Sequence, residues 1–91
     1  MSLSVEEEFK FSVSQINKGT FNLTNDEKLN FYAYYKQATI GKCNKVKPSV
    51  LNLVETYKWE NWNKLGQMSK NEAMKKYNDL FIDIYKKYNI I

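Results

Sequence analysis

The sequence predicts a small all-α protein built from four helices. Its 91 residues include only three glycines and one proline, so long stretches can remain regular. Glu, Lys, Leu, Ala and Met fill these stretches, and all five favour helices. Apolar residues recur at helical spacing, and no segment alternates as a strand would. We therefore expect one domain over residues 1–91, folded as a four-helix bundle.

The first helix is predicted over residues 4–18. Ser4 can cap its N-terminus, and three glutamates follow in the first turn, where the helix dipole favours negative charge. Gly19 is placed to end the helix. Its apolar stripe consists of Val5, Phe9, Val13 and Ile16.

The second helix is predicted over residues 24–41. Thr24 and Glu27 form a capping-box pattern at its start, and Gly41 is placed to close it. Its inward face is expected to hold Leu29, Ala33 and Ile40, flanked by Phe31 or Tyr32.

The third helix is predicted over residues 50–65, after a basic loop. Pro48 disfavours helical geometry at the residue before it, so the helix must begin later. Trp59 and Trp62 are three residues apart and share a face. We expect both to be core residues, although one of them could line a ligand channel.

The fourth helix is predicted over residues 69–89. Ser69 and Glu72 repeat the capping-box pattern. The apolar stripe of this helix consists of Ala73, Tyr77, Leu80, Phe81, Ile84 and Tyr88.

Composition narrows the possible functions. The net charge is +4, and an excess of lysine favours an anionic partner. All fourteen basic residues are lysine, and the lack of arginine weighs against nucleic acid, because base and phosphate recognition relies on arginine. There is no histidine, no glycine-rich phosphate loop and no metal-ligand spacing. We therefore expect neither an enzyme nor a metal or cofactor site.

Two further features bear on the cellular environment. Residues 1–8 are acidic and lack the apolar stretch of a secretory signal, and no apolar run approaches the length of a membrane span. The single cysteine, Cys43, allows no internal disulfide. These features predict a soluble cytoplasmic protein.

A candidate site lies on the second predicted helix. Tyr32, Tyr35 and Lys36 share one helical face, which presents two phenols and an ammonium group. Such a face suits a ligand with an aromatic ring and a phosphate. Lys58 and Tyr77, on other helices, could complete a pocket. Taken singly, residues of these types are more often packing residues or solvated surface.

Three motifs together resemble the acyl-CoA-binding protein family. They are Tyr-x-x-Tyr-Lys-Gln-Ala-Thr-x-Gly at residues 32–41, Lys-Trp-x-x-Trp-Asn at 58–63, and Ser-Lys-x-x-Ala-Met-x-x-Tyr at 69–77. The resemblance covers nearly the whole chain. It implies an up-down-down-up bundle that binds medium- to long-chain fatty acyl-CoA esters. It also implies a carrier and pool former in lipid and fatty acid metabolism.

The resemblance also implies which residues bind the ligand. The residue matching Tyr35 stacks near adenine, and the one matching Tyr77 packs beside the nucleotide. The 3′-phosphate is held by the residues matching Tyr32, Lys36 and Lys58. The full set implied is Tyr32, Ala33, Tyr34, Tyr35, Lys36, Lys58 and Tyr77.

The first helix departs from the family pattern. The family often has a basic residue there that reaches the ligand, and this chain has Asn17 at that place, with Lys18 beside it. Either residue could make the contact.

The expected partners follow from this resemblance. They are the acyl-CoA ligand and, transiently, acyl-CoA-using enzymes or membranes, with the protein itself a monomer that binds no nucleic acid. The alternative is a basic helical module for protein or nucleic-acid interaction. The sequence leaves the preferred acyl chain length open.

Overall fold

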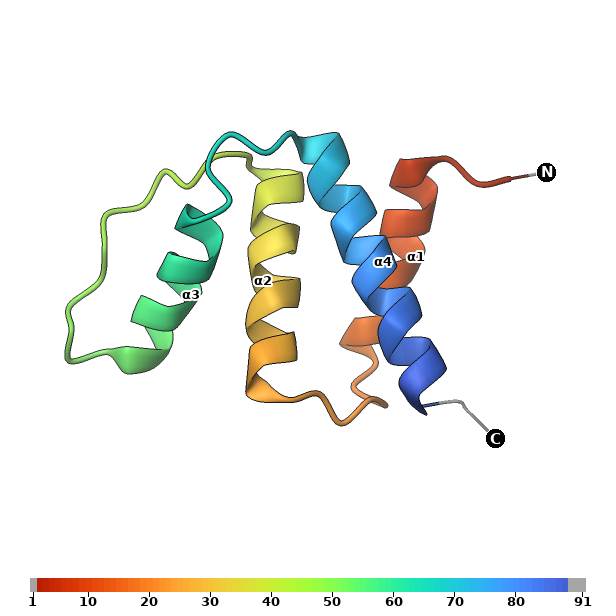
Figure 1. Cartoon of the computed structure of the whole chain (residues 1–91), viewed down its shortest axis with the longest axis horizontal. Coiled ribbons are helices and arrows are strands. Elements are labelled where there is room, and N and C mark those ends of the chain that lie inside the picture. Colours follow the sequence, from red (N-terminus) through yellow and green to blue (C-terminus); the bar gives the residue numbers. More distant parts are fainter. Residues whose placement is uncertain (1, 89–91) are drawn as a thin grey trace.

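Four α-helices form the protein over residues 2–88, the part that this computed structural model describes. They are α1 (Val5–Asn17), α2 (Asn25–Thr39), α3 (Leu53–Asn63) and α4 (Lys70–Tyr88). Figure 1 shows α2 and α3 running in one direction and α1 and α4 in the other. The predicted up-down-down-up order is therefore confirmed.

The helices α1 and α2 begin with the same reciprocal pair of hydrogen bonds. The Ser4 hydroxyl accepts from the Glu7 amide at 3.1 Å, and the Glu7 carboxylate accepts from the Ser4 amide at 3.0 Å. Thr24 and Glu27 form the equivalent pair, at 3.1 and 2.8 Å. These capping boxes satisfy amide groups that a helix start leaves without partners. The predicted starts of both helices are confirmed.

The start of α4 is also capped, by one bond. The Ser69 hydroxyl accepts from the Glu72 amide at 3.0 Å. This bond is the first half of the predicted capping box. The predicted last residue of this helix, at position 89, lies outside the described residues.

The prediction was wrong about where α3 begins. The helix starts at Leu53 rather than at residue 50, because the Asn52 side chain accepts from the Glu55 amide at 3.3 Å and caps it. Before this cap, Val50 and Leu51 lie in a turn and are exposed. The helix also ends two residues early, at Asn63 rather than residue 65.

The end of α2 corrects a second prediction. The helix ends at Thr39, and Ile40 is exposed rather than directed inward. Gly41 then adopts a φ of 101°, a left-handed conformation that glycine adopts without steric cost. The chain thus turns away from the core one residue earlier than the apolar pattern indicated.

An aromatic core fills the space between α1, α2 and α4. Tyr77 packs edge-on against Phe9 and Phe31, with ring centroids 5.1 and 4.9 Å apart. Such pairs add stabilisation beyond the buried area. Most of the predicted stripes on α1 and α4 contribute to this core. Tyr88 is an exception: it is exposed, although its hydroxyl donates to the Asn22 carbonyl.

The helix α3 lies outside this core and, among the described helices, packs on α2 alone. Two indole groups hold the long connection from α2 to α3. The Trp62 Nε1 donates to the Gly41 carbonyl at 2.9 Å, and the Trp59 Nε1 donates to the Lys45 carbonyl at 2.7 Å. Trp62 is 0% exposed, so its predicted burial is confirmed, although it lies at the contact with α2 rather than in the aromatic core. Trp59 is only half-buried and is not the core residue that we expected.

We expect Trp62→Phe to destabilise the fold by about 2–4 kcal/mol, because it removes buried volume and leaves the Gly41 carbonyl without its donor. Urea denaturation measures the loss. Trp59→Phe is the matched control, since it removes a similar bond from a partly exposed ring and should cost less. A loss of stability in Trp62→Phe that is equal to or smaller than the loss in Trp59→Phe would contradict this account of the connection.

Candidate ligand-binding site

Two grooves meet at the side chains of Lys28 and Tyr32. The first, which we call the α2–α3 groove, has a volume of about 610 Å³. It is lined by Asn25, Asp26, Lys28, Leu29, Tyr32, Val54, Tyr57, Lys58 and Asn61. The second, the α1–α2–α4 groove, has a volume of about 400 Å³. It is lined by Val13, Ile16, Asn17, Lys28, Phe31, Tyr32, Tyr35 and Tyr77.

Two ammonium groups lie close to the Tyr32 ring. The Nζ atom of Lys58 is 4.8 Å from the ring centroid, and that of Lys36 is 5.8 Å away. The Lys36 Nζ also lies 5.7 Å from the Trp62 ring. An ammonium over an aromatic face is attracted by the ring's electron density, so the rings hold both charges near one place. Side chains from α2 and α3 thus come together at the Tyr32 ring.

The Lys58 charge remains available to an anion. Lys58 pairs with Glu55 on its own helix at 3.5 Å, and both side chains are partly exposed. Such a pair is weak, because water screens it and both side chains are flexible. An anion arriving at Tyr32 can therefore compete with Glu55 for the Lys58 ammonium group.

The Tyr32 hydroxyl is a hydrogen-bond donor at neutral pH. Partial burial raises the pKa of this phenol, and the nearby Glu55 carboxylate raises it further. The hydroxyl therefore stays protonated beside the two ammonium groups. Tyr32 therefore offers a neutral donor, and two charged donors, Lys36 and Lys58, lie close to its ring.

Tyr35 and Tyr77 line the α1–α2–α4 groove in different ways. Tyr35 is 41% exposed, and its ring stacks on Phe9 at a centroid distance of 6.1 Å and an interplanar angle of 27°. Tyr77 is 3% exposed and belongs mainly to the core. Burial, followed by the influence of Tyr35, raises the pKa of Tyr77 to about 12. An aromatic ligand can therefore stack on Tyr35, with Tyr77 as a rigid wall.

The structure does not bring every predicted residue to the grooves. Ala33 is buried in the helix packing, and Tyr34 packs against the hydrophobic core. Lys36 is not among the residues that line either groove, although its Nζ atom lies 5.8 Å from the Tyr32 ring centroid. Of the two candidates on α1, Asn17 lines the α1–α2–α4 groove. Lys18 caps the end of α1, where its amide donates to the Gln15 carbonyl, and its side chain is exposed.

Sequence reasoning missed several groove residues. Lys28 lies four positions before Tyr32, so extending the helical face backwards would have found it. The residues of α3 that line the α2–α3 groove also have helical spacing and lie on one face. They are Val54, Tyr57, Lys58 and Asn61. The spacing alone did not show which face of α3 would meet α2.

A comparison with models of protein families identifies the family of this chain. Residues 6–81 match the family model described as "Acyl CoA binding protein". The chain belongs to the acyl-CoA-binding protein family. The resemblance of the three motifs is therefore confirmed, and acyl-CoA binding is the activity of this family.

Individual family members share much of this sequence. The "Acyl-CoA-binding domain-containing protein 5" of Xenopus laevis is 45% identical over 75 residues, which cover 78% of this chain and 16% of that protein. The chain thus spans about a sixth of that relative. The "Acyl-CoA-binding protein homolog 3" of Caenorhabditis elegans is 34% identical over 96 residues, covering 97% of this chain and 83% of that protein.

The family fold is confirmed by a solved structure. The crystal structure titled as ACBP from Moniliophthora perniciosa matches with a TM-score of 0.89 at 31% identity. The match covers 98% of this chain and 87% of the other. The predicted fold class, an all-α bundle of this family, is correct.

We expect the contribution of Tyr77 to the stability of the protein to be fully present below pH about 10 and to fall by about 2–3 kcal/mol as the pH approaches 12. Burial raises the pKa of Tyr77 to about 12 in the folded state, so the unfolded chain loses this proton first and is favoured by rising pH. Urea denaturation across this range, with phenolate absorbance, measures the effect.

Tyr77→Phe should flatten this alkaline slope. Tyr57→Phe is the control, since that exposed phenol meets solvent in both states. If the decrease of stability between pH about 10 and about 12 is unchanged in Tyr77→Phe, its assignment to Tyr77 is wrong.

Proposed function

We propose that this chain is an intracellular carrier that binds medium- to long-chain fatty acyl-CoA esters through the two grooves. The observation that supports this best is Tyr32, which lines both grooves and whose ring centroid lies 4.8 Å from the Lys58 Nζ atom and 5.8 Å from the Lys36 Nζ atom. A polar anionic head and an apolar tail need different surroundings. Two grooves that share one cationic junction offer both.

The 3′-phosphate of CoA is proposed to bind at this junction. Lys36 and Lys58 supply positive charge, and the Tyr32 hydroxyl supplies a neutral donor, because its raised pKa keeps it protonated. Each charge-assisted hydrogen bond contributes about 1.5–3 kcal/mol where the pair is partly desolvated. Lys28, which lines both grooves, is a further candidate for the phosphate groups.

The adenine ring is proposed to stack on Tyr35 in the α1–α2–α4 groove. The Tyr35 ring is already held by stacking on Phe9, so little side-chain freedom is lost on binding. Tyr77 would form the wall of this groove. Asn17 is proposed as the polar contact from α1, with Lys18 as a more distant charge.

The acyl tail is proposed to lie in the α2–α3 groove. Leu29, Val54 and the Tyr57 ring line this groove with apolar surface. Each buried methylene is worth about 0.8 kcal/mol, so a palmitoyl tail offers on the order of 10 kcal/mol before the costs of binding. We therefore expect tighter binding of long-chain esters than of free CoA.

The role proposed for such binding is to keep a detergent-like ester dispersed and to deliver it. The protein would act as a cytoplasmic monomer, with transient contacts to acyl-CoA-using enzymes, and residues 1–91 would act as one binding domain. We expect no catalysis, metal or cofactor. Among residues 2–88, no helix is both long enough and apolar enough to cross a membrane.

An interaction module for protein or nucleic acid is not favoured. The chain contains no arginine, and two of its lysines, Lys28 and Lys58, line a concave site rather than a flat basic face. The functions of the longer relatives as whole proteins are not transferred to this chain.

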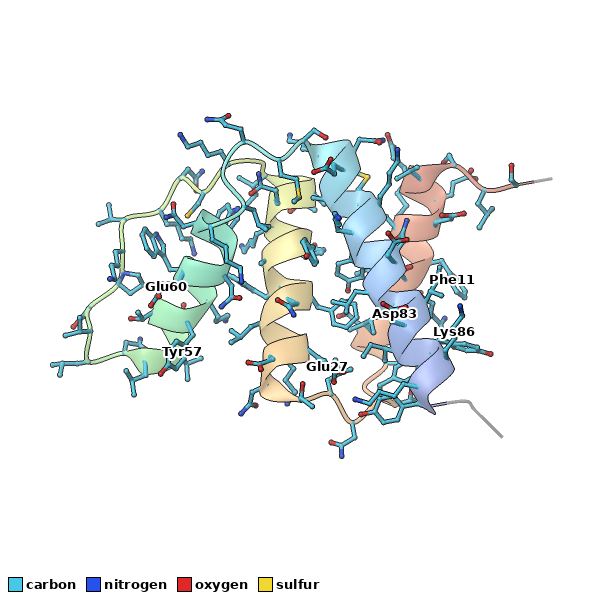
Figure 2. All side chains as sticks on the ribbon, in the orientation of Figure 1. Phe11, Glu27, Tyr57, Glu60, Asp83 and Lys86 are labelled. Carbon is cyan, nitrogen blue, oxygen red and sulfur yellow. The ribbon has the colours of Figure 1, made fainter. Side chains whose placement is uncertain are left out.

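We expect palmitoyl-CoA to bind one-to-one in a calorimetric titration, much more tightly than free CoA or palmitate. Lys36→Ala and Lys58→Ala should each weaken binding about 10- to 100-fold, because each removes one charged contact to the phosphate. Tyr35→Ala should also weaken it. Lys86→Ala is the matched control, since Lys86 lies on the side of α4 that is turned away from α2 and α3 (Figure 2). Equal effects of Lys36→Ala and Lys86→Ala would contradict the proposed phosphate site.

We also expect Leu29→Asn to reduce the gain in affinity with acyl chain length, because it places an amide in the α2–α3 groove. Titration with esters of increasing chain length measures this gain, while free CoA binding should stay unchanged. Leu53→Asn is the control, since Leu53 is exposed and is not among the residues that line the groove. Flat affinity across chain lengths in the unmodified protein would refute the proposed tail site.

A further inference from the structure

The connection between α2 and α3 carries exposed aliphatic side chains that neither groove uses. Val46, Val50, Leu51 and Leu53 are 90%, 71%, 92% and 60% exposed. We call these four residues the apolar edge. Side chains this exposed contribute little to packing within the chain, and a concentration of them on a surface marks an interaction site.

Positive charge accompanies the apolar edge. Residues 42–54 include Lys42, Lys45 and Lys47 and contain no aspartate or glutamate. Val46 lies between two of these lysines in the chain. The next carboxylate, Glu55, pairs with Lys58 at 3.5 Å. The segment therefore presents aliphatic and cationic groups together.

The position of this segment favours contact with a large surface. The molecule measures 44 × 27 × 17 Å. Figure 1 shows the connection at one end of the long axis, beyond α3 and far from α1 and α4. The indole bonds to Gly41 and Lys45 hold the first part of the connection in place. The apolar edge is thus an anchored projection that can meet a flat surface before the bundle does.

We propose that the apolar edge docks this protein on the surface of an anionic phospholipid membrane. The lysines are attracted to the negative surface, and the aliphatic side chains enter the boundary between headgroups and acyl chains. A protein partner fits this chemistry less well. Protein interfaces are enriched in aromatic residues and arginine and depleted in lysine, whereas this segment combines aliphatic residues with lysine.

The docked orientation has a consequence for the α2–α3 groove. Val54 and Tyr57 line this groove and follow the apolar edge directly in the chain. Figure 2 shows Tyr57 near the start of α3, where the connection ends. Docking would therefore place the end of the groove at the start of α3 near the lipid, where an amphiphilic ester could be exchanged. This consequence rests on the proposed acyl-CoA binding, but docking itself does not.

The test is co-sedimentation of the whole chain with ligand-free vesicles of phosphatidylcholine, with or without phosphatidylserine. We expect binding to the anionic vesicles alone and its loss at high salt. Leu51→Ser combined with Val46→Ser should weaken binding about tenfold or more, because the variants remove apolar contact with the lipid. Lys45→Gln should weaken it about fivefold.

Matched controls come from the other end of the molecule. Leu3→Ser changes an exposed leucine in the segment before α1, and Lys86→Gln changes an exposed lysine on α4. Both should leave vesicle binding unchanged. Titration of every variant with palmitoyl-CoA in solution should give unchanged affinity, which separates failure of docking from failure of the binding site.

Three results would overturn the proposal. One is the absence of binding to anionic vesicles. Another is equal loss of binding in the edge variants and in the Leu3→Ser control. The third is a dimer, seen by analytical ultracentrifugation, that Leu51→Ser dissociates, since the apolar edge would then belong to a second copy of the chain.

Discussion

The parallel arrangement of α2 and α3 is the constraint on which the rest of the structure depends. Antiparallel neighbours can be joined by a short turn, but parallel helices require the chain to return along the length of a helix, about 16 Å for the eleven residues of α3. The returning connection has no regular structure to hold it. Trp62 and Trp59 supply the missing restraint by donating hydrogen bonds to its backbone at Gly41 and Lys45. The same parallel arrangement creates the α2–α3 groove and exposes the apolar edge.

Tyr32 connects the packing of the bundle with its proposed chemistry. Its ring attracts the ammonium groups of Lys36 and Lys58, and its partial burial keeps the hydroxyl protonated. Lys36 and Lys58 are thereby held near the same ring, where a single carboxylate, that of Glu55, pairs with Lys58 at 3.5 Å. This leaves a net positive site for an anion. The aromatic core formed by Phe9, Phe31 and Tyr77 packs beneath the same region, on the interior side of α2.

Local signals predicted much of the fold because helix ends depend on nearby residues. The Ser4 and Thr24 capping boxes and the glycines after α1 and α2 act within a few residues, so the sequence displayed them directly. The start of α3 was misplaced because the apolar residues before it suggested a longer helix. Val50 and Leu51 are exposed instead, and the Asn52 cap decides the boundary. Ile40 was misplaced for a similar reason, since the helix ends before its side chain can turn inward.

The sequence by itself determined the helical class, the capped starts and the family, together with the tyrosines and lysines of the candidate site. These features are local patterns or contiguous motifs. The tertiary structure alone decided that Lys28 lines both grooves, that Tyr34 packs against the hydrophobic core, and that Val54 and Tyr57 complete the α2–α3 groove. The physical reason is that a helical pattern defines a face but not its neighbour. Which faces meet depends on how α3 packs on α2, and that packing is set by contacts between residues distant in the chain.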